Sequence, residues 1–427
     1  MVLEDWAVDV EEAVNNMEDM SKESELKKKR CIYRVPDRIR ELDNNAFKPQ
    51  VVSFGPYYYN ERDSWPLEEH KNRALLQFLK RSQKHLPPYL DALAREVEDL
   101  KYAYDQDVRS AWLMNDDERF LKMMILDGCF ILEILGTSRV FAASSPDPIY
   151  LNEMPLISRD MLLLENQVPL RVLEILQEVI YSIRRFFGLA RRSQSMYKGC
   201  LHILDVYRRG LLVEPLKDIR QIRKLNDFYD NMQTREFCTD IPSATELHEA
   251  GIRFKISKTA KLNDITFKGS TLRLPPIMVT DDTKSFFLNL MAFERVHVGA
   301  GNEVTSYVFF MGCLIKSDRD ASLLRSFGFV PGALGSDEDV AQLYRLISKK
   351  AMLHPDQWEL VKVLERMNSK LRNRVMMRLS AWRLDLLQNY LKSPWGVVSV
   401  IGAIIIFTLT AIQTVYTVLS YIHRKDK

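Results

Sequence analysis

The chain has 427 residues, of which 46% are hydrophobic and 27% charged, and its formal net charge is +3. This length fits one large domain or two of medium size, and the hydrophobic fraction is enough for a sizeable core. So small a net charge excludes a general electrostatic attraction to nucleic acid, and no nucleic-acid partner is expected.

The five cysteines are scattered along the chain, and no two of them have the CxxC spacing of a metal site. They are too few and too dispersed for a dense disulfide framework. Most are therefore expected to be small buried residues in a reducing compartment, and no cofactor is expected. The cysteines are Cys31, Cys129, Cys200, Cys238 and Cys313.

Residues 1–30 form an acidic, amphipathic N-terminal segment that ends in a basic junction. Trp6, Val10 and Val14 recur at helical spacing, and the run 27–30 contains three lysines and an arginine. The chain start has neither the basic residues nor the apolar run of a signal peptide. The junction is interpreted as a solvated charge run, with a nuclear localisation signal as the alternative.

Residues 31–393 are expected to form one mostly helical domain. A division of this domain into two lobes, 31–187 and 196–393, stays open. Apolar residues at helical spacing predict most of its elements. The predicted helices cover about 66–82, 88–106, 116–136, 158–187, 282–297, 304–316 and 355–393. Pro169 is expected either to kink the helix over 158–187 or to start its second half. Ser336 is expected to cap a further helix, with Asp339 at the third helical position as in a capping box.

Short alternating segments predict a small β component. Residues 252–256 alternate with period two, and residues 265–268 and 271–274 do so more loosely. Val51–Phe54 also resembles a short strand. The fold class predicted from these elements is mainly α with a small antiparallel β component (α+β), plus one C-terminal transmembrane helix.

The apolar run from Trp395 to Ile422 contains no charged side chain and is followed by the short basic tail 423–427. Because a helix needs roughly 20 apolar residues to cross a bilayer, the run predicts a transmembrane helix, with a buried core helix as the alternative. Trp395, Tyr416 and Tyr421 would anchor it at the membrane interfaces. Since no signal peptide is seen, we expect a tail anchor in the plasma membrane with the large domain in the cytosol.

Two groups of residues are candidates for an interaction surface. Residues 184–224 contain eleven lysines and arginines against three acidic residues, and they would form either a solvated face or a contact for anionic lipid or an acidic partner. The arginines singled out are Arg184, Arg185, Arg191, Arg192, Arg208 and Arg209. Tyr57, Tyr58 and Tyr59 either form an exposed interface or pack into the core.

No catalytic motif is found, whether P-loop, dinucleotide-binding, zinc-protease, nucleophile-elbow or kinase. Cys129 lies in an apolar setting that makes a thiol inert. His202 and Asp205 are one helical turn apart and are either a structural pair or a catalytic one. The polar string Glu165–Gln167 interrupts an apolar run, and its side chains are expected to hydrogen-bond loops to the core or to line a ligand pocket.

Several strings, in order and at specific spacing, resemble the plant membrane family called domain of unknown function 247. The resemblance covers about residues 30–420 and departs from the family at Tyr58 and Tyr59, where a histidine usually follows. The matching strings lie at 32–36, 52–57, 69–73, 123–133, 159–169, 241–251 and 289–294. The family resemblance implies a single-pass membrane protein with a mostly helical domain and no established catalysis, and some grass members are linked to pollen self-incompatibility as male determinants.

The function expected from these observations is that of a membrane-anchored recognition protein of plants. It would bind an unidentified protein partner, as a pollen self-incompatibility determinant does through allele-specific contacts. Two alternatives stay open. One is an enzyme with a site around His202, Asp205 and Glu165–Gln167, and the other is a lipid-binding scaffold that uses residues 184–224.

Overall fold

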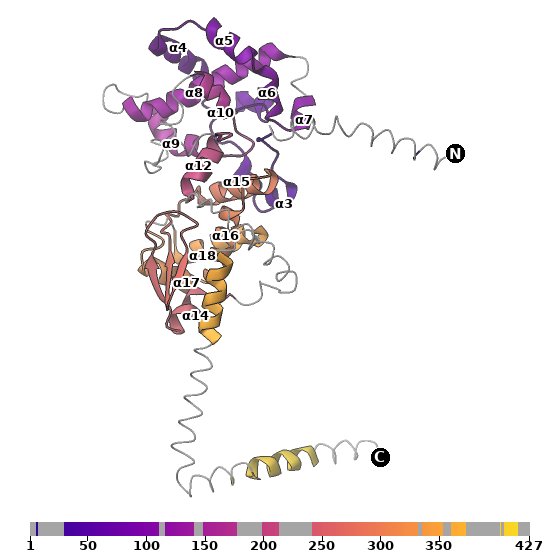
Figure 1. Ribbon diagram of the computed structural model, residues 1–427, viewed down its shortest axis with the longest axis vertical. Helices are drawn as coiled ribbons and strands as arrows, with labels where there is room; N and C mark the ends of the chain where they lie inside the picture. The colour runs from indigo at the N-terminus through magenta and orange to yellow at the C-terminus, as the bar shows by residue number, and fades with distance from the viewer. Residues whose placement is uncertain are drawn as a thin grey trace, which may run out of the picture. The chain divides into compact units, whose positions relative to one another are not determined.

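The computed structural model describes Trp6 and residues 30–110, 116–140, 148–176, 199–212, 241–331, 335–352, 360–372, 402 and 405–416. The chain divides into two compact units, Met1–Val363 and Leu364–Lys427. The first unit is mainly helical with one small sheet, as the sequence predicts, and it contains the elements labelled in Figure 1.

The first half of this unit is built around one long buried helix, α8 (Asp117–Val140), on which α4, α5 and α10 pack. Apolar side chains such as Phe120, Met124 and Phe130 are buried along α8, because a helix that is covered on several sides is apolar on several sides. The other helices of this half are α3 (Asp37–Arg40), η1 (Asn44–Phe47), η2 (Tyr59–Ser64), α4 (His70–Ser82), α5 (Pro87–Ala94), α6 (Val97–Tyr102), α7 (Gln106–Val108), α9 (Pro148–Asp160), α10 (Leu170–Leu176) and α12 (Ile203–Leu211).

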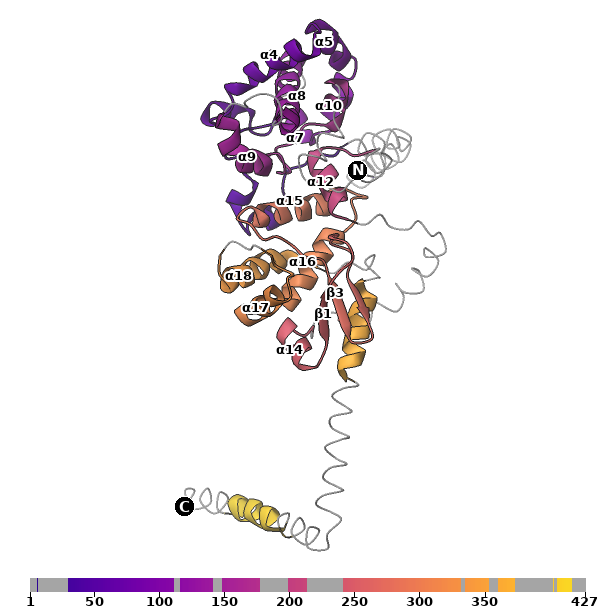
Figure 2. The same cartoon turned by 90° about the vertical axis from the view of Figure 1, so that its left-hand side faces the viewer.

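The second half of the unit combines short helices with the sheet. α15 (Thr283–Val296) packs against α16 and α18, and it also contacts η1 of the first half, where Ser285 Oγ donates to the Ala46 carbonyl over 2.6 Å. Figures 1 and 2 show α15 between α12 and α16. The other helices here are α14 (Ala244–Glu249), α16 (Glu303–Leu314), α17 (Asp318–Ser326), α18 (Asp337–Ile347) and η5 (Ser348–Lys350).

Three of these helices begin with a complete capping box, in which the cap side chain and the third helical residue bond reciprocally. The pairs are Ser243 with Glu246, Ser317 with Asp320, and Ser336 with Asp339. The box at Ser336 confirms the prediction from sequence. Each box satisfies amide groups that a helix start would otherwise leave without acceptors.

The sheet has three strands in the order β1-β3-β2: β1 (Arg253–Ile256), β2 (Thr266–Lys268) and β3 (Thr271–Leu274). β2 and β3 form an antiparallel hairpin around Gly269, whose φ of 64° suits glycine. β1 runs parallel to β3, so the prediction of an antiparallel sheet is wrong for this pair. Alternation predicts the strands but carries no information about their partners, and the connection 257–265 takes the chain to the far side of β3.

Three predicted elements differ from the structure. Within the helix predicted over 158–187 the structure has a break: α9 ends at Asp160, and α10 starts at Leu170, directly after Pro169, which the prediction allowed as the start of a second half. In the intervening segment, side chains bond the backbone instead. Gln167 Nε2, for example, donates to the carbonyls of Met161 and Leu163 over 2.8 and 2.7 Å. The helix predicted over 88–106 is divided into α5 and α6. Val51–Phe54 is not a strand, and its amide groups donate to side chains.

The predicted transmembrane helix over 395–422 is wrong: in the described part of the chain, no helix is both long and apolar enough to cross a membrane. The single-pass plasma-membrane anchor assigned to Trp395, Tyr416 and Tyr421, and the cytosolic placement built on it, are corrected with it. Tyr416 is exposed, and Trp395 and Tyr421 lie outside the described residues.

Candidate functional site

Residues 50–55 form an extended segment that has no partner strand in the described part of the chain, and residues 51–55 of it are buried in the first half. Its amide groups donate to side chains supplied by α8, by α9, by the segment after α9 and by the turn that precedes α4. Asp160, at the end of α9, accepts hydrogen bonds from the amides of Gln50, Val51 and Val52 over 2.9, 2.8 and 3.2 Å. Val52 and Phe54 are completely buried, so these unpaired amides would be costly without such acceptors.

The next three amides of the segment use three further acceptors. Ser53 donates to Glu68 over 2.8 Å, Phe54 to Asn166 Oδ1 over 2.6 Å, and Gly55 to Asp127 over 2.8 Å. Gly55 has a φ of 69°, and a Cβ atom added there would lie 2.6 Å from the Gln167 carbonyl oxygen. Strings that lie far apart in the sequence therefore converge on one backbone segment.

A buried lysine neutralises part of this acidic network. Lys71 of α4 is 2% exposed, and its Nζ lies 2.8 Å from Asp127 Oδ1 and 2.8 Å from Glu68 Oε2. The same Nζ donates to the Ser53 carbonyl. Charges this deep in a protein are tolerated only when they are paired and hydrogen-bonded, as they are here.

The network continues around Glu165. Its carboxylate accepts from the Val35 amide over 2.8 Å and from the Tyr58 hydroxyl over 2.8 Å, and it pairs with Arg40. Burial raises the pKa of Asp160 to about 6, although three amides and the Arg159 guanidinium oppose this shift. The polar string Glu165–Gln167 thus hydrogen-bonds loops to the core, one of the two alternatives left open by the sequence.

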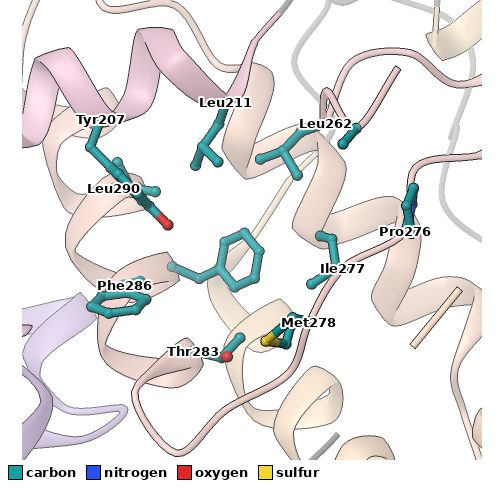
Figure 3. A pocket seen from close by; sticks show the side chains of 11 residues that line it. Tyr207, Leu211, Leu262, Pro276, Ile277, Met278, Thr283, Phe286 and Leu290 are labelled. Carbon is teal, nitrogen blue, oxygen red and sulfur yellow. The ribbon is translucent and has the colours of Figure 1, made fainter. Parts of the chain in front are cut away.

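An apolar pocket of about 220 Å³ lies between α12, α15 and the loops that precede β2 and follow β3 (Figure 3). Leu262, Phe287 and Leu290 are buried at its base, whereas Met278 is 66% exposed. The lining residues are Tyr207, Leu211, Ala260, Leu262, Pro276, Ile277, Met278, Thr283, Phe286, Phe287 and Leu290. No charged side chain is among them, so the pocket suits an apolar group.

Backbone hydrogen bonds hold the walls of this pocket. The Leu262 amide donates to the Leu211 carbonyl over 2.9 Å, and the Ile277 amide donates to the Phe329 carbonyl over 2.8 Å. The Thr283 hydroxyl accepts from the Thr280 amide over 2.7 Å, so this polar group is used within the wall. The pocket is therefore shaped by the fold before any ligand is present.

The three tyrosines of the candidate interaction surface are placed differently from one another. Tyr58 is 7% exposed and packs in the interior against Glu165. Tyr57 is half-buried, with the Arg34 guanidinium 5.4 Å from its ring centre, and Tyr59 is half-buried with Arg119 at 4.7 Å.

The arginines of the candidate surface fall into two groups. Arg208 is buried and pairs with Glu294 over 2.8 Å and with Glu303, whereas half-exposed Arg209 pairs with Asp205 over 3.0 Å. Burial raises the pKa of Glu294, which also accepts from the amides at the start of α16. Arg184, Arg185, Arg191 and Arg192 lie outside the described residues.

His202 caps α12. Its Nδ1 accepts from the Asp205 amide over 3.2 Å and its Nε2 donates to the Cys31 carbonyl over 3.1 Å, an arrangement that requires the neutral ring. Burial lowers the pKa of His202 to about 4. The Asp205 carboxylate accepts from the Leu201 amide over 3.1 Å. The Leu204 amide donates to Gln167 Oε1 over 3.1 Å, so the two polar strings meet. Their polar atoms are occupied by backbone groups and by the side chains of Tyr58, Arg40 and Arg209.

Cys129 is fully buried, and burial raises the pKa of its thiol to about 12, as expected for an inert cysteine. Within the described ranges, no group of three or more His, Cys, Asp and Glu residues is arranged to hold a metal ion. The apolar pocket was missed at the sequence level, because Tyr207, Phe286 and Leu290 have the helical spacing of ordinary core residues. Only the tertiary packing leaves a cavity between them.

Comparison with known proteins agrees with the resemblance noted in the sequence. The chain is 30% identical over 436 residues to UPF0481 protein At3g47200 of Arabidopsis thaliana, which covers 94% of this chain and 89% of that protein. Putative UPF0481 protein At3g02645, also of Arabidopsis thaliana, is 27% identical over 175 residues, or 40% of this chain and 32% of that protein. No solved structure matches. Residues 32–409 match DUF247, described as plant protein of unknown function, and the chain therefore belongs to this family.

Proposed function

We propose that the protein is a recognition protein that binds a protein partner, and that the pocket in Figure 3 receives an apolar side chain of that partner. The observation that carries the proposal is a preformed apolar pocket with an exposed methionine, Met278, at its opening. Methionine is common at binding surfaces because its flexible thioether adapts to different partners.

The size of the pocket favours a side chain over a small molecule. Ligand pockets usually measure roughly 300–1,000 Å³, whereas this one measures about 220 Å³. An apolar cavity of about 150 Å³ can hold benzene, so the space suits one large aliphatic or aromatic side chain. An anchor residue in a desolvated pocket is the usual centre of a protein interface.

The rigidity of the walls also supports a binding role. Leu262 and Ile277 are fixed by hydrogen bonds of their amide groups. Pro276 restricts the backbone of the loop that follows β3. A pocket that is ordered in advance loses little conformational entropy when a partner binds. The enzyme alternative has less support, because the groups suggested for catalysis are hydrogen-bonded to backbone groups and to neighbouring side chains. The lipid-binding alternative concerns residues 184–224, most of which lie outside the described ranges.

The test uses the full chain and two matched variants, Met278→Glu and Met352→Glu. Both methionines are 66% exposed, so the substitutions add the same charge to equally exposed positions, but only Met278 lines the pocket. A random peptide library is selected against the wild-type chain, and the affinity of each selected peptide is measured for all three proteins by fluorescence anisotropy.

The expected result is a set of peptides that share one large apolar residue and bind Met278→Glu at least about tenfold more weakly, since burying a carboxylate in an apolar pocket is costly. Met352→Glu should bind like the wild type, and Ala260→Trp, which adds a large ring to the pocket lining, should bind weakly. Peptides that bind Met278→Glu and the wild type equally, or the enrichment of no peptide at all, would contradict the proposal.

A finer role in pollen self-recognition is implied by the family resemblance and stays a prediction. A knockout plant that still rejects its own pollen would rule that role out for this gene.

A further inference from the structure

The outward face of the three-stranded sheet gathers basic side chains. Because successive residues of a strand point to opposite faces, the pairing places Phe254, Leu272 and Phe267 in one buried row across the sheet. Phe254 packs against Phe327 and Phe329 of the core, with ring centres 5.8 and 6.2 Å apart. The residues between them in sequence therefore point outward.

The outward side chains form two rows. One row is Lys255, Arg273 and Thr266, and the other is Arg253, Thr271 and Lys268. Arg253, Lys255 and Lys268 are exposed, and Arg273 on the central strand is half-buried. Each row thus combines two cations with one threonine hydroxyl. Figure 2 shows β1 and β3 side by side.

We call these four cations the basic sheet face, and in the described part of the chain none of them is paired with a carboxylate. Residues 251–280 contain six lysines and arginines but one acidic residue, Asp264, which binds Thr259 in the loop before β2. Among the residues that the structure describes, no carboxylate pairs with any of the four. Lys255 lies directly opposite Arg273, and like charges in that position destabilise a sheet.

We propose that the basic sheet face binds an acidic, extended segment of a partner protein. The repulsion between Lys255 and Arg273 is unfavourable in the isolated chain and is relieved when carboxylates lie over it. The two rows are roughly 7 Å apart along the strands, which is also the spacing of alternate side chains in an extended peptide. Acidic residues at every second position would therefore face both rows.

The other polyanions fit this face less well. Single-stranded nucleic acid is usually held by aromatic side chains on which bases stack, and the outward rows contain only lysine, arginine and threonine. A protein that docks on a membrane surface usually inserts apolar side chains beside its basic residues, and the same rows have none. A purely charged and hydroxyl-bearing face suits carboxylates.

The basic sheet face and the pocket can serve one partner. Arg273 precedes Pro276 by three residues, so their Cα atoms lie no more than about 11 Å apart. This inference rests on the proposed function in taking the ligand to be a protein segment, but it concerns different residues. It predicts that the partner carries alternating acidic residues close to its apolar anchor.

The experiment measures binding of a fluorescein-labelled peptide with alternating glutamate and serine to the full chain by anisotropy. A peptide with glutamine in place of glutamate is the uncharged control. The variant K255E/R273E reverses two charges on the face, and K349E/K350E reverses two exposed lysines of η5 as a matched control. Circular dichroism of both variants shows whether they remain folded.

We expect the glutamate peptide to bind, K255E/R273E to bind at least about tenfold more weakly, and K349E/K350E to bind like the wild type, because only the first pair faces the ligand. Affinity for the glutamate peptide should fall as salt is raised from low to physiological concentration. Equal loss in both variants, or equal binding of the glutamine peptide, would overturn the inference. The inference would also be overturned if phosphatidylserine vesicles or an oligonucleotide bound through Lys255 and Arg273 and the glutamate peptide did not bind.

The two proposals fail separately. If Met278→Glu leaves the library peptides bound but K255E/R273E releases the acidic peptide, the pocket role is wrong and the basic sheet face stands. If the acidic peptide never binds while the library peptides depend on Met278, the pocket role stands alone.

Discussion

Replacing Lys71 with methionine should destabilise the protein far more than an equivalent change at its surface. Methionine keeps most of the length of the side chain and removes its charge. Lys71 is 2% exposed, and its Nζ lies 2.8 Å from carboxylate oxygens of both Asp127 and Glu68. Asp127 is completely buried, so the substitution leaves a negative charge in the interior without its main counter-ion.

Removing one partner of a buried ion pair typically costs about 3–5 kcal/mol, because the remaining charge is desolvated and unpaired. We expect a loss within that range, since the Gly55 amide still donates to Asp127 and compensates only part of the change. The matched control is Arg171→Met. Arg171 lies 2.6 Å from Glu96 but is 53% exposed, so this change should cost less than about 1 kcal/mol.

The measurement is equilibrium urea denaturation of the full chain, followed by circular dichroism at helical wavelengths. Lys71→Met should lower the transition midpoint without changing the slope. Adding Asp127→Asn should recover part of the loss, because the uncompensated charge is then absent. A loss of stability in Lys71→Met that is no larger than the loss in Arg171→Met would refute the reasoning. The reasoning is that burial, rather than the distance between the charged atoms, decides how much an ion pair contributes to stability.

Two further predictions concern packing and pH. Gly128→Val should destabilise the protein by about 1–3 kcal/mol, because even a Cβ atom there would lie 2.6 Å from Leu176 Cδ1. Thermal denaturation should show a lower midpoint than for the control Gly402→Val, where nothing lies within 4 Å of the added Cβ atom. Equal midpoints for the two variants would count against this prediction. Burial holds the pKa of His202 at about 4, below its value of 6.5 in an unfolded chain, so the unfolded state binds the proton first as pH falls. The free energy of unfolding should therefore be unaffected by this group above pH 6.5 and should fall by about 3 kcal/mol as the pH is lowered towards 4. Urea titrations of the wild type and of His202→Asn should show a different dependence of this free energy on pH. An identical pH dependence in the two proteins would contradict the prediction.

The elements that depend on neighbouring residues could be predicted from the sequence. The capping box at Ser336 and Asp339 lies within a stretch of four residues. The apolar residues whose helical spacing predicts α15 and α16 lie within each helix's own sequence. The polar string Glu165–Gln167 could also be interpreted locally, because three polar groups in an apolar run must find partners. Sequence indicated that they would bond loops to the core, but it did not indicate which loop.

The errors arose where distant residues decide the structure. Val51–Phe54 has the composition of a strand, but its acceptors come from Asp160 and other residues up to more than a hundred positions away. The partner of β1 is likewise set by the path of residues 257–265. The transmembrane prediction treated the whole of 395–422 as one helix, and the described part does not provide one.

The basic sheet face could have been predicted from the sequence if the charged residues had been counted in a different way. Charge was summed along the chain, which singled out residues 184–224. Within 253–273, the cations occupy alternate positions of short strands, so their linear density is modest while their density on one face is high. Counting charge separately for each face of a predicted strand would have shown it.

The way residues 50–55 are held has a consequence for the order of folding. A strand can pair with its neighbour as soon as the two meet, but this segment takes its acceptors from α8, α9, the segment after α9 and the turn before α4. Its backbone gains its bonds only after those helices have assembled, since no local partner is present. The segment is therefore a late-forming connector whose contacts span long sequence distances, and such contacts slow folding. Once in place, it links the elements that supply its acceptors, so we expect these elements to open together in hydrogen exchange.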